Sequence, residues 1–373
     1  MSIIQLKSQT DLSGFHIFFE GSTMNERKGI YGISHLMEHL VCKSFEKYIE
    51  DFENDGIVWN AETHDSYVRF YFTGLEKYIN KYIDRICNEI FTFNITEEQL
   101  EMEKKIVVEE YKDSFNRQID AHILNLSRKK MNSYGAIGLL EDIENITMKD
   151  CMDFFEVQYS KPTKIIHVTK NDHRGLFQKI EFANKIFTNK LDGNYTGDFF
   201  YEKSNLYDQK SSVINFQMVD QNQAHIMFIT RMLGAGLKSP LYQEVREKKG
   251  LVYYIGCDVS KMTNNDGMLA IYTETSDDNV NEVQDTIFDV IGNPEKFMTR
   301  ERFNIVKQSY EIRAMKDDIN RFVSIDDYLL ADQWKVSSII NDITYDQIMD
   351  VYGNYLTTDK FYKSVDKTEF IGL

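Results

Sequence analysis

The sequence predicts an α+β protein built from two similar domains, and three observations predict it. The chain has 373 residues, about twice the length of an ordinary domain. Hydrophobic residues make up 42% and aromatic residues 13%, with only 3 prolines, which is typical of folded cores rather than of disordered chains. The order strand, helix, hairpin, helices is predicted in the first half and again in the second, which indicates a duplicated unit.

The first half opens with a strand over residues 14–20, and after a polar loop an amphipathic helix is expected from about 32 to 54. Residues 59–72 are rich in aromatic and β-branched side chains, and they predict a strand, a turn and a second strand. This segment order places the loop, the helix and the hairpin close together in the chain.

Thr96 and Gln99 have the spacing of a capping box and predict the start of a long helix. Glu103 and Glu110 lie two turns apart on that helix and therefore share one of its faces. A strand over residues 163–169 is expected to end the first half.

Residues 191–206 are polar and contain glycine, as interdomain linkers do. We therefore predict a first domain over residues 1–190, a linker over 191–206 and a second domain over 207–373. The second domain is expected to contain these elements: a strand over 212–219, a helix around 239–249, a strand pair over 251–259 and 268–274, and further helices.

The charge and the cysteines exclude several classes of protein. Lysine and arginine total 43 against 59 acidic residues, giving a net charge of -16, so the chain repels nucleic acid. No run approaches the ~18 apolar residues of a membrane span, and the start does not resemble a signal peptide. The four cysteines form no close pair, which favours reduced core residues. We expect no membrane or nucleic-acid partner, and a location in the cytoplasm or in a virus particle assembled there.

The segment HLMEH at residues 35–39 carries the clearest chemical signal. On a helix His35 and His39 lie on one face, one turn apart, which is the spacing that a tetrahedral zinc site uses. Glu38 lies on the same side, close enough to take a proton from a water activated by the metal. We predict His35 and His39 as zinc ligands and Glu38 as the general base.

A catalytic zinc usually has three protein ligands and one open position, so another donor must come from elsewhere in the chain. The long helix that contains Glu103, Glu109 and Glu110 is the best source. Glu109 is more simply explained as a solvated surface charge. Glu110 follows Ile106 and Val107 within an apolar stripe, where a carboxylate needs a partner. We predict Glu110 as the third ligand.

These residues resemble the inverted zincin peptidases, the family of pitrilysin, insulin-degrading enzyme and the mitochondrial processing peptidase. Residues 32–40 (GISHLMEHL) are similar to the family's zinc helix, and residues 21–26 resemble the motif before it. Glu103 to Glu110 fits the family's E-x(6)-E pattern. The resemblance implies one Zn²⁺ per chain with Glu110 as the distal ligand, and it implies that Glu103 orients a ligand without binding the metal itself.

Asn60-Ala61 followed by Thr63 resembles the N-A-x-T that begins the family's active-site edge strand. It implies that Asn60 and Ala61 bind a peptide substrate as an added β-strand. The resemblance covers most of the chain and implies that each domain is an α/β sandwich, with helices on one face of a mixed, mostly antiparallel sheet. Together the two domains would form half of a clam-shell peptidase.

Residues 236–253 (GLKSPLYQEVREKKGLVY) are similar to the family's C-terminal signature, in which an arginine and a tyrosine act on the substrate. The resemblance places Arg246 and Tyr253 in these roles, since a guanidinium can grip a peptide carbonyl and a phenol can stabilise an oxyanion. We expect Tyr253 to lie on a strand, with Tyr254 pointing to the opposite face.

The expected activity is that of a zinc-dependent endopeptidase that hydrolyses peptide bonds in unstructured peptides or in a protein precursor. The resemblance implies that two chains close together, with the arginine and tyrosine supplied from the chain opposite the zinc, as a homodimer or with a related partner chain. The alternative is a non-catalytic, peptide-binding or structural subunit of the same fold. Such members usually lose a metal or base position, whereas this chain keeps all of them. General peptide degradation and maturation of one protein both remain open.

Overall fold

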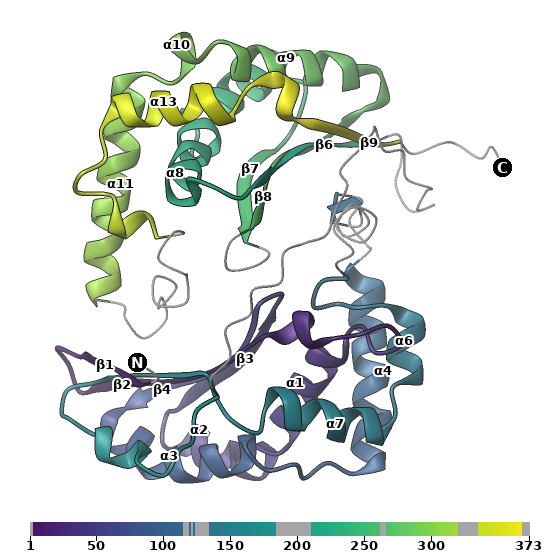
Figure 1. The fold of residues 1–373 in the computed structure, drawn as a ribbon, viewed down its shortest axis with the longest axis vertical. Helices are drawn as coiled ribbons and strands as arrows, with labels where there is room; N and C mark the ends of the chain where they lie inside the picture. The colour runs from purple at the N-terminus through teal and green to yellow at the C-terminus, as the bar shows by residue number, and fades with distance from the viewer. Residues whose placement is uncertain are drawn as a thin grey trace. The chain divides into compact units, whose positions relative to one another are not determined.

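The protein is described by a computed structural model that covers residues 3–114, 119–120, 122–123, 134–183, 210–261, 266–319 and 335–367. The linker predicted over residues 191–206 lies outside these described residues. Contacts divide the chain into two compact units (Figure 1). Unit 1 comprises Met1–Ser114, Ser133–Asn189 and Asp317–Ile325. Unit 2 comprises Phe115–Asn132, Lys190–Lys316 and Asp326–Leu373.

Unit 1 contains a five-stranded sheet with the strand order β1-β5-β2-β4-β3. Its strands are β1 (Ile3–Lys7), β2 (Leu12–Glu20), β3 (Val58–His64), β4 (Tyr67–Leu75) and β5 (Lys164–Thr169). Only β1 and β5 pair in parallel, and the other pairs are antiparallel. The described part of this sheet is therefore mixed and mostly antiparallel, and β3 lies at one of its edges.

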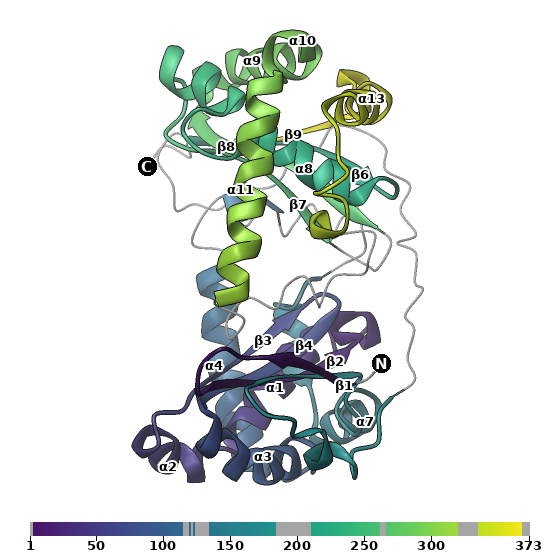
Figure 2. The same ribbon diagram turned by 90° about the vertical axis from the view of Figure 1, so that its left-hand side faces the viewer.

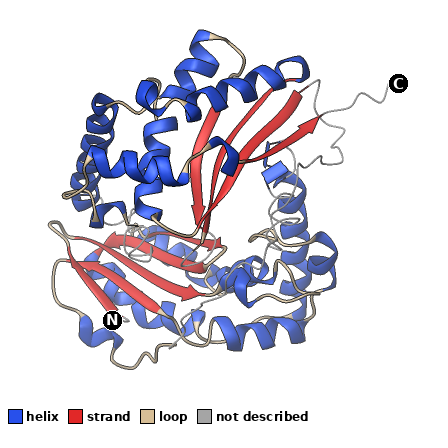
Figure 3. Cartoon of the chain, turned by 45° about the horizontal axis from the view of Figure 1, so that its top comes forward, coloured by secondary structure: helices blue, strands red, loops and turns tan. Residues whose placement is uncertain are grey.

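Helices cover one face of this sheet, as Figure 3 shows. They are α1 (Ile33–Lys43), α2 (Ile49–Asn54), α3 (Glu76–Ile90), α4 (Glu97–Ser114), α6 (Leu140–Asn145) and α7 (Met148–Gln158), with the short 3-10 helices η1 (Ser22–Asn25), η2 (Glu46–Tyr48) and η3 (Arg174–Phe177). Alternate residues of each central strand, such as Phe15 and Ile17 of β2, face the helices and form the core. The capping box of Thr96 and Gln99 is confirmed by their reciprocal hydrogen bonds.

The single helix predicted over residues 32–54 was wrong, because the chain turns after α1. The backbone N–H and the hydroxyl of Ser44 both donate to the carbonyl of Val41, at 3.0 and 2.7 Å, which ends the helical hydrogen-bond pattern. Phe45 is fully buried and packs against Trp59 and Phe72. A straight helix would not bring Phe45 into this aromatic core.

Unit 2 contains a four-stranded antiparallel sheet with the order β7-β8-β6-β9. Its strands are β6 (Lys210–Val219), β7 (Ile255–Lys261), β8 (Gly267–Ser276) and β9 (Tyr362–Lys367). Its helices are α8 (Gln223–Gly234), the π-helix η4 (Tyr242–Lys248), α9 (Val280–Gly292), α10 (Pro294–Phe297), α11 (Arg300–Ile319) and α13 (Tyr345–Tyr355), with the 3-10 helices η5 (Asp277–Asn279), η7 (Val336–Ser338) and η8 (Thr358–Lys360) (Figure 2). No described helix is long and apolar enough to cross a bilayer.

The two sheets share one topology, which confirms the predicted fold class of two similar α+β domains. The order β3-β4-β2-β5 in unit 1 corresponds to β7-β8-β6-β9 in unit 2. Unit 1 adds β1 at the far edge. In both units a helix follows the first strand of this common set, and a hairpin follows that helix.

A segment from the first half of the sequence belongs to unit 2 and packs on its sheet. Ile119 and Ile123 contact an apolar cluster that includes Phe216. Between them, His122 is buried and its two ring nitrogens lie 2.8 Å from the hydroxyl of Ser212 and 2.7 Å from that of Ser364. These contacts join the first half of the sequence to strands β6 and β9.

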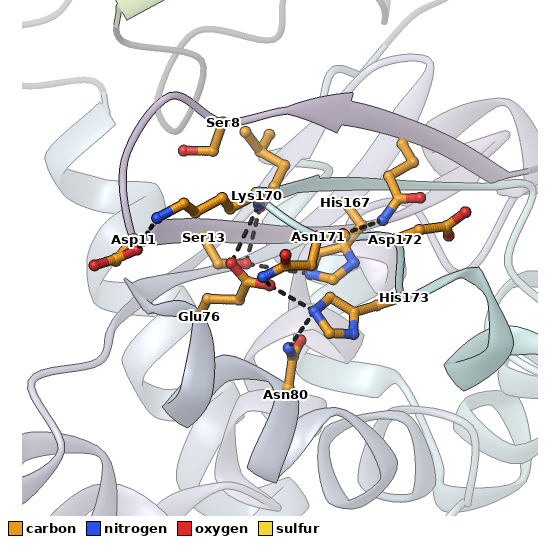
Figure 4. Close-up of polar contacts among 12 residues, drawn as sticks. Ser8, Asp11, Ser13, Glu76, Asn80, His167, Lys170, Asn171, Asp172 and His173 are labelled. Atoms are coloured by element: carbon orange, nitrogen blue, oxygen red, sulfur yellow. Dashed lines mark hydrogen bonds and ion pairs between the residues drawn. The ribbon is translucent and has the colours of Figure 1, made fainter.

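Glu76, the first residue of α3, ties this helix to the segment after β5 (Figure 4). Its carboxylate accepts from the backbone N–H of Lys170 at 3.2 Å and the Asn171 amide at 2.9 Å, and it lies 2.5 Å from His173 Nε2. Burial alone would raise the pKa of Glu76, but hydrogen bonds from these neighbours outweigh it and lower the pKa to about 2.

Candidate metal centre

The N-terminus of α1 is shaped by Gly32 and Glu26. Gly32 has φ +101, and a Cβ there would lie 2.9 Å from Ile143 Cγ1, so both conformation and space require glycine. The Glu26 carboxylate accepts from the backbone N–H of Gly32 at 3.0 Å and of Ser34 at 2.9 Å. A carboxylate at this position accepts hydrogen bonds from N–H groups that have no partner within the helix, and its negative charge interacts favourably with the positive end of the helix dipole. The helix that carries the HLMEH segment is therefore anchored at its start.

His35, His39 and Glu110 come together as predicted from the sequence. His35 and His39 project from the same face of α1, and Glu110 comes from α4. His35 Nε2 lies 3.2 Å from His39 Nε2, and Glu110 Oε2 lies 3.4 Å from the first and 3.5 Å from the second. Among the described residues, this is the one group of three such side chains close enough to hold a metal ion.

The dimensions of this triangle fit a tetrahedral zinc site. Zinc bonds of about 2.0–2.2 Å at tetrahedral angles separate the ligand atoms by about 3.3–3.6 Å, close to the three measured distances. Burial, and next the neighbouring His39, lower the pKa of His35 to about 4, so its imidazole is neutral at pH 7 and can be a ligand. Three electron-rich atoms that face one another at these distances favour a cation between them.

Glu103 holds the second imidazole in place. Its Oε2 lies 3.1 Å from His39 Nδ1, so an N–H at Nδ1 can donate to Glu103 and leave Nε2 with its lone pair toward the triangle. Glu103 is buried, with its other oxygen 3.2 Å from Lys43 Nζ. This arrangement agrees with the predicted role of Glu103 in orienting a ligand.

The apolar stripe of α4 differs from the predicted one. Val107 is fully buried, but Ile106 is 39% exposed, and Leu100 and Glu103 complete the buried face instead. The side chain of Glu110 is 45% exposed. Glu110, the predicted third ligand, is therefore placed by the same helix face as Glu103 and not by burial among apolar residues.

Glu38 lies beside the triangle and is 9% exposed. Its Oε2 accepts a hydrogen bond of 2.6 Å from the hydroxyl of Thr63 on β3. Burial raises the pKa of Glu38 above its ordinary value, and the hydrogen bond from Thr63 opposes that rise. The contact with Thr63 was missed from the sequence, because no spacing rule relates residues of α1 to those of β3.

Asn60 and Ala61 lie on the edge strand β3, as predicted. They point to opposite faces of the sheet: Ala61 packs against the core, and Asn60 donates to the hydroxyl of Tyr71 at 3.3 Å. An edge strand offers backbone N–H and C=O groups to an extended peptide. The hydrogen bond from Thr63 to Glu38 places β3 beside α1.

Arg246 and Tyr253 lie in unit 2 and contact each other, with the guanidinium carbon 5.1 Å from the ring centre. Arg246 also donates to the hydroxyl of Tyr242. The prediction that Tyr253 lies on a strand was wrong, because β7 begins only at Ile255. Strand alternation therefore does not separate Tyr253 from Tyr254. Tyr253 is 85% exposed, so its phenol is available to another molecule.

Strand β7 begins at Ile255 and not at residue 251 as predicted, and local contacts explain the difference. Gly250 adopts φ +63, which turns the chain after η4. The hydroxyl of Thr273 on β8 then donates a hydrogen bond to the carbonyl of Tyr254, and the hydroxyl of Thr275 donates one to the carbonyl of Leu251. Side chains of β8, and not a ladder of backbone hydrogen bonds, therefore hold this segment. The segment lines a cavity of about 690 Å³ together with Tyr272 and others.

The chain matches peptidase family models along most of its length. Residues 3–136 match the family model described as insulinase (peptidase family M16), and residues 170–310 match the model described as peptidase M16 inactive domain. An uncharacterized zinc protease of Bacillus subtilis, YmxG, is 25% identical over 285 residues, which cover 72% of this chain and 69% of that protein. An uncharacterized zinc protease of Rickettsia felis is 23% identical over 376 residues, covering 91% and 87%.

Solved structures show the same fold. A protease from Helicobacter pylori has a TM-score of 0.84 at 16% identity, covering 98% of this chain and 96% of that one. A peptidase M16 inactive domain from Pseudomonas fluorescens has a TM-score of 0.76 at 14% identity, covering 99% and 95%. The insulinase match contains His35, His39 and Glu110, whereas the inactive-domain match falls on the half without them.

Proposed function

The chain belongs to the M16 peptidase family, and from this premise we propose that it is a zinc-dependent endopeptidase acting on unstructured peptides or on a protein precursor. The observation that carries the proposal is the triangle of His35, His39 and Glu110, whose edges of 3.2, 3.4 and 3.5 Å suit tetrahedral zinc. Two relatives are named as zinc proteases, which supports zinc as the metal.

A zinc ion held by these three side chains would supply a Lewis acid that activates water and polarises the scissile carbonyl. Glu38 accepts a proton from the attacking water and delivers it to the leaving nitrogen. Its burial suits this task, since a raised pKa brings a carboxylate nearer to the working pH. The exposed edge of β3 binds the peptide as an added strand, which requires an extended substrate and reads few side chains.

We place Arg246 and Tyr253 on the substrate as well. The guanidinium grips a peptide carbonyl, and the Tyr253 hydroxyl donates to the oxyanion that forms as water attacks. The exposure of Tyr253, 85%, supports a role toward another molecule and not toward its own core.

The proposal includes a homodimer in which one chain supplies the metal ligands and its partner supplies Arg246 and Tyr253. The support is that the two sets belong to different compact units of one chain. Specific activity should then fall on dilution as the dimer dissociates. Full activity of a monomer, established by light scattering at the assay concentration, would contradict it.

The non-catalytic alternative predicts metal or peptide binding without hydrolysis. The inactive-domain match does not favour it, because that match covers residues 170–310 and not the half that contains Glu38. A complete set of ligands and base in the matched insulinase half supports catalysis instead.

The decisive experiment compares zinc content and hydrolysis of a quenched, unstructured peptide in the wild type and in Glu38→Gln. The variant should keep about one zinc per chain and lose hydrolysis by about 10²–10⁴-fold, as expected on removing a general base. Glu50→Gln, at an exposed position of α2, is the matched control and should behave as wild type. A wild type that binds zinc but cleaves no peptide, alone or with partner chains, would establish the binding-subunit alternative.

A further inference from the structure

We propose that Thr63 is a positioning residue for the general base, and that it links the Glu38 carboxylate to the edge strand on which the peptide docks. The inference rests on the proposed peptidase function. It starts from one contact, in which the Thr63 hydroxyl donates to Glu38 Oε2 at 2.6 Å.

The pleat of β3 sets the direction of the Thr63 side chain. Trp59 and Ala61 pack against the core beneath the helices, and Thr63 follows at the same alternation. Its backbone is held in register opposite Val68 of β4, a fully buried residue. A hydroxyl on this face, at this position of the strand, therefore points at α1 and meets Glu38.

The hydrogen bond restricts a side chain that would otherwise have freedom. A glutamate has several rotatable bonds, and holding it in one rotamer costs conformational entropy. Threonine is stiff at its first torsion because it is branched at Cβ, so a short hydrogen bond from it to a carboxylate fixes the acceptor well. With Oε2 engaged by Thr63, the remaining oxygen of Glu38 is left to accept the proton of water.

The strand that carries Thr63 is also the strand proposed to bind the substrate. A peptide that adds to the edge of β3 pairs with the same backbone that places the Thr63 hydroxyl. Small shifts of β3 on substrate docking are thereby transmitted to Glu38. Displacements of about 1 Å can cost about 10²-fold in rate, so the contact is placed to affect the chemical step more than binding.

The test uses Thr63→Val, which removes the hydroxyl and keeps the shape, and Thr63→Ser, which restores a hydroxyl. For the zinc-loaded protein with a quenched peptide we expect Thr63→Val to lower kcat by about 10- to 100-fold with KM changed less than about threefold. Thr63→Ser should recover most of kcat. Zinc content should be the same in all three proteins.

Thr163→Val is the matched control. The Thr163 hydroxyl donates to the carbonyl of Phe18 at 3.0 Å and accepts from the backbone N–H of Glu20 at 3.0 Å, within the same unit, so this variant removes two structural hydrogen bonds without touching Glu38. Its kcat should remain near that of wild type. If Thr63→Val does not fold, Thr63→Ala provides the same comparison. Equal kcat in the Thr63→Val and Thr163→Val proteins would overturn the inference.

Crystal structures of the wild type and of Thr63→Val give a readout that does not depend on activity. The Glu38 carboxylate should leave its wild-type position in the variant, and an unmoved carboxylate would contradict the inference. If the wild type hydrolyses no peptide, the peptidase proposal fails by itself, and these structures still decide whether Thr63 holds Glu38.

Discussion

Unit 1 and unit 2 share a strand order but use the helix after the first common strand differently. In unit 1, α1 carries His35, Glu38 and His39. In unit 2, α8 occupies the corresponding place in the order of elements and contains one histidine, His225, in a largely buried apolar sequence. The topology alone therefore does not make the candidate metal site, which depends on a few side chains of α1 and α4.

The long helices α4 and α11 show the same contrast. α4 presents Glu103 and Glu110 to the histidines of α1. α11 instead presents Arg302, which is buried and donates to the carbonyl of Met232 at 2.9 Å and of Arg231 at 2.8 Å, near the end of α8. By our proposal, the helix pair α1 and α4 binds a metal in unit 1. In unit 2 the corresponding pair, α8 and α11, uses Arg302 to donate hydrogen bonds to carbonyls near the end of α8.

Among the substitutions that compare the two units, the largest effect on activity is expected at Tyr253 of unit 2, from the role proposed for its hydroxyl. Tyr253→Phe should lower kcat/KM by about 10²–10³-fold, the usual cost of losing an oxyanion donor, with zinc content unchanged. Tyr254→Phe is the control, since its hydroxyl has no proposed role. Equal losses in the two variants, measured by steady-state peptide hydrolysis, would remove Tyr253 from the mechanism.

Glu103→Gln should affect the metal and not the fold. Loss of the carboxylate beside His39 Nδ1 should weaken zinc affinity about 10- to 100-fold, measured by competition with a chelator. Glu109→Gln changes the same residue type on α4, where the side chain is 71% exposed, and should leave the affinity unchanged. An unaltered affinity in Glu103→Gln would show that His39 does not depend on it.

Arg302→Met in unit 2 should have the opposite effect to Glu103→Gln: it should lower the stability of the fold and leave the zinc content unchanged. The carbonyls of Arg231 and Met232 lose their donor in a buried site, which costs about 1–3 kcal/mol in the free energy of unfolding. Urea unfolding measures this cost, and zinc content serves as the control. A loss of zinc would mean that the two units are not independent in this respect.

The smallest effect concerns Glu76 and appears as a dependence on pH. Its folded-state pKa of about 2 lies below the ordinary value of 4.5, so its contribution to stability is present above about pH 4.5 and is lost as the pH falls toward 2. The difference in urea stability between wild type and Glu76→Gln should therefore shrink between pH 6 and pH 3.5. A difference that stays constant over this range would show that the carboxylate charge is not what matters.

Local spacing was enough to predict that His35 and His39 share one face of a helix. The choice of Glu110 rested on an apolar stripe that the structure does not have as expected, since Ile106 is 39% exposed, and on the resemblance to the E-x(6)-E pattern. The two hairpins were predicted from their β-rich segments, but the order of the strands in each sheet was not predicted. Three features needed tertiary information. The burial of Phe45 breaks the helix after α1, the hydroxyls of Thr273 and Thr275 delay β7, and Thr63 reaches Glu38 across two elements. Helix α8, which is apolar on several sides, was not predicted.

The measurement that tests the account most directly is the zinc content of purified wild type, His39→Ala and His225→Ala, determined by elemental analysis after dialysis. The account predicts about one zinc per chain in the wild type and in His225→Ala, and less than about a tenth of that in His39→Ala, because a three-ligand site loses a ligand only in the latter. Zinc retained by His39→Ala, or lost from His225→Ala, would contradict the assignment of the metal centre to unit 1.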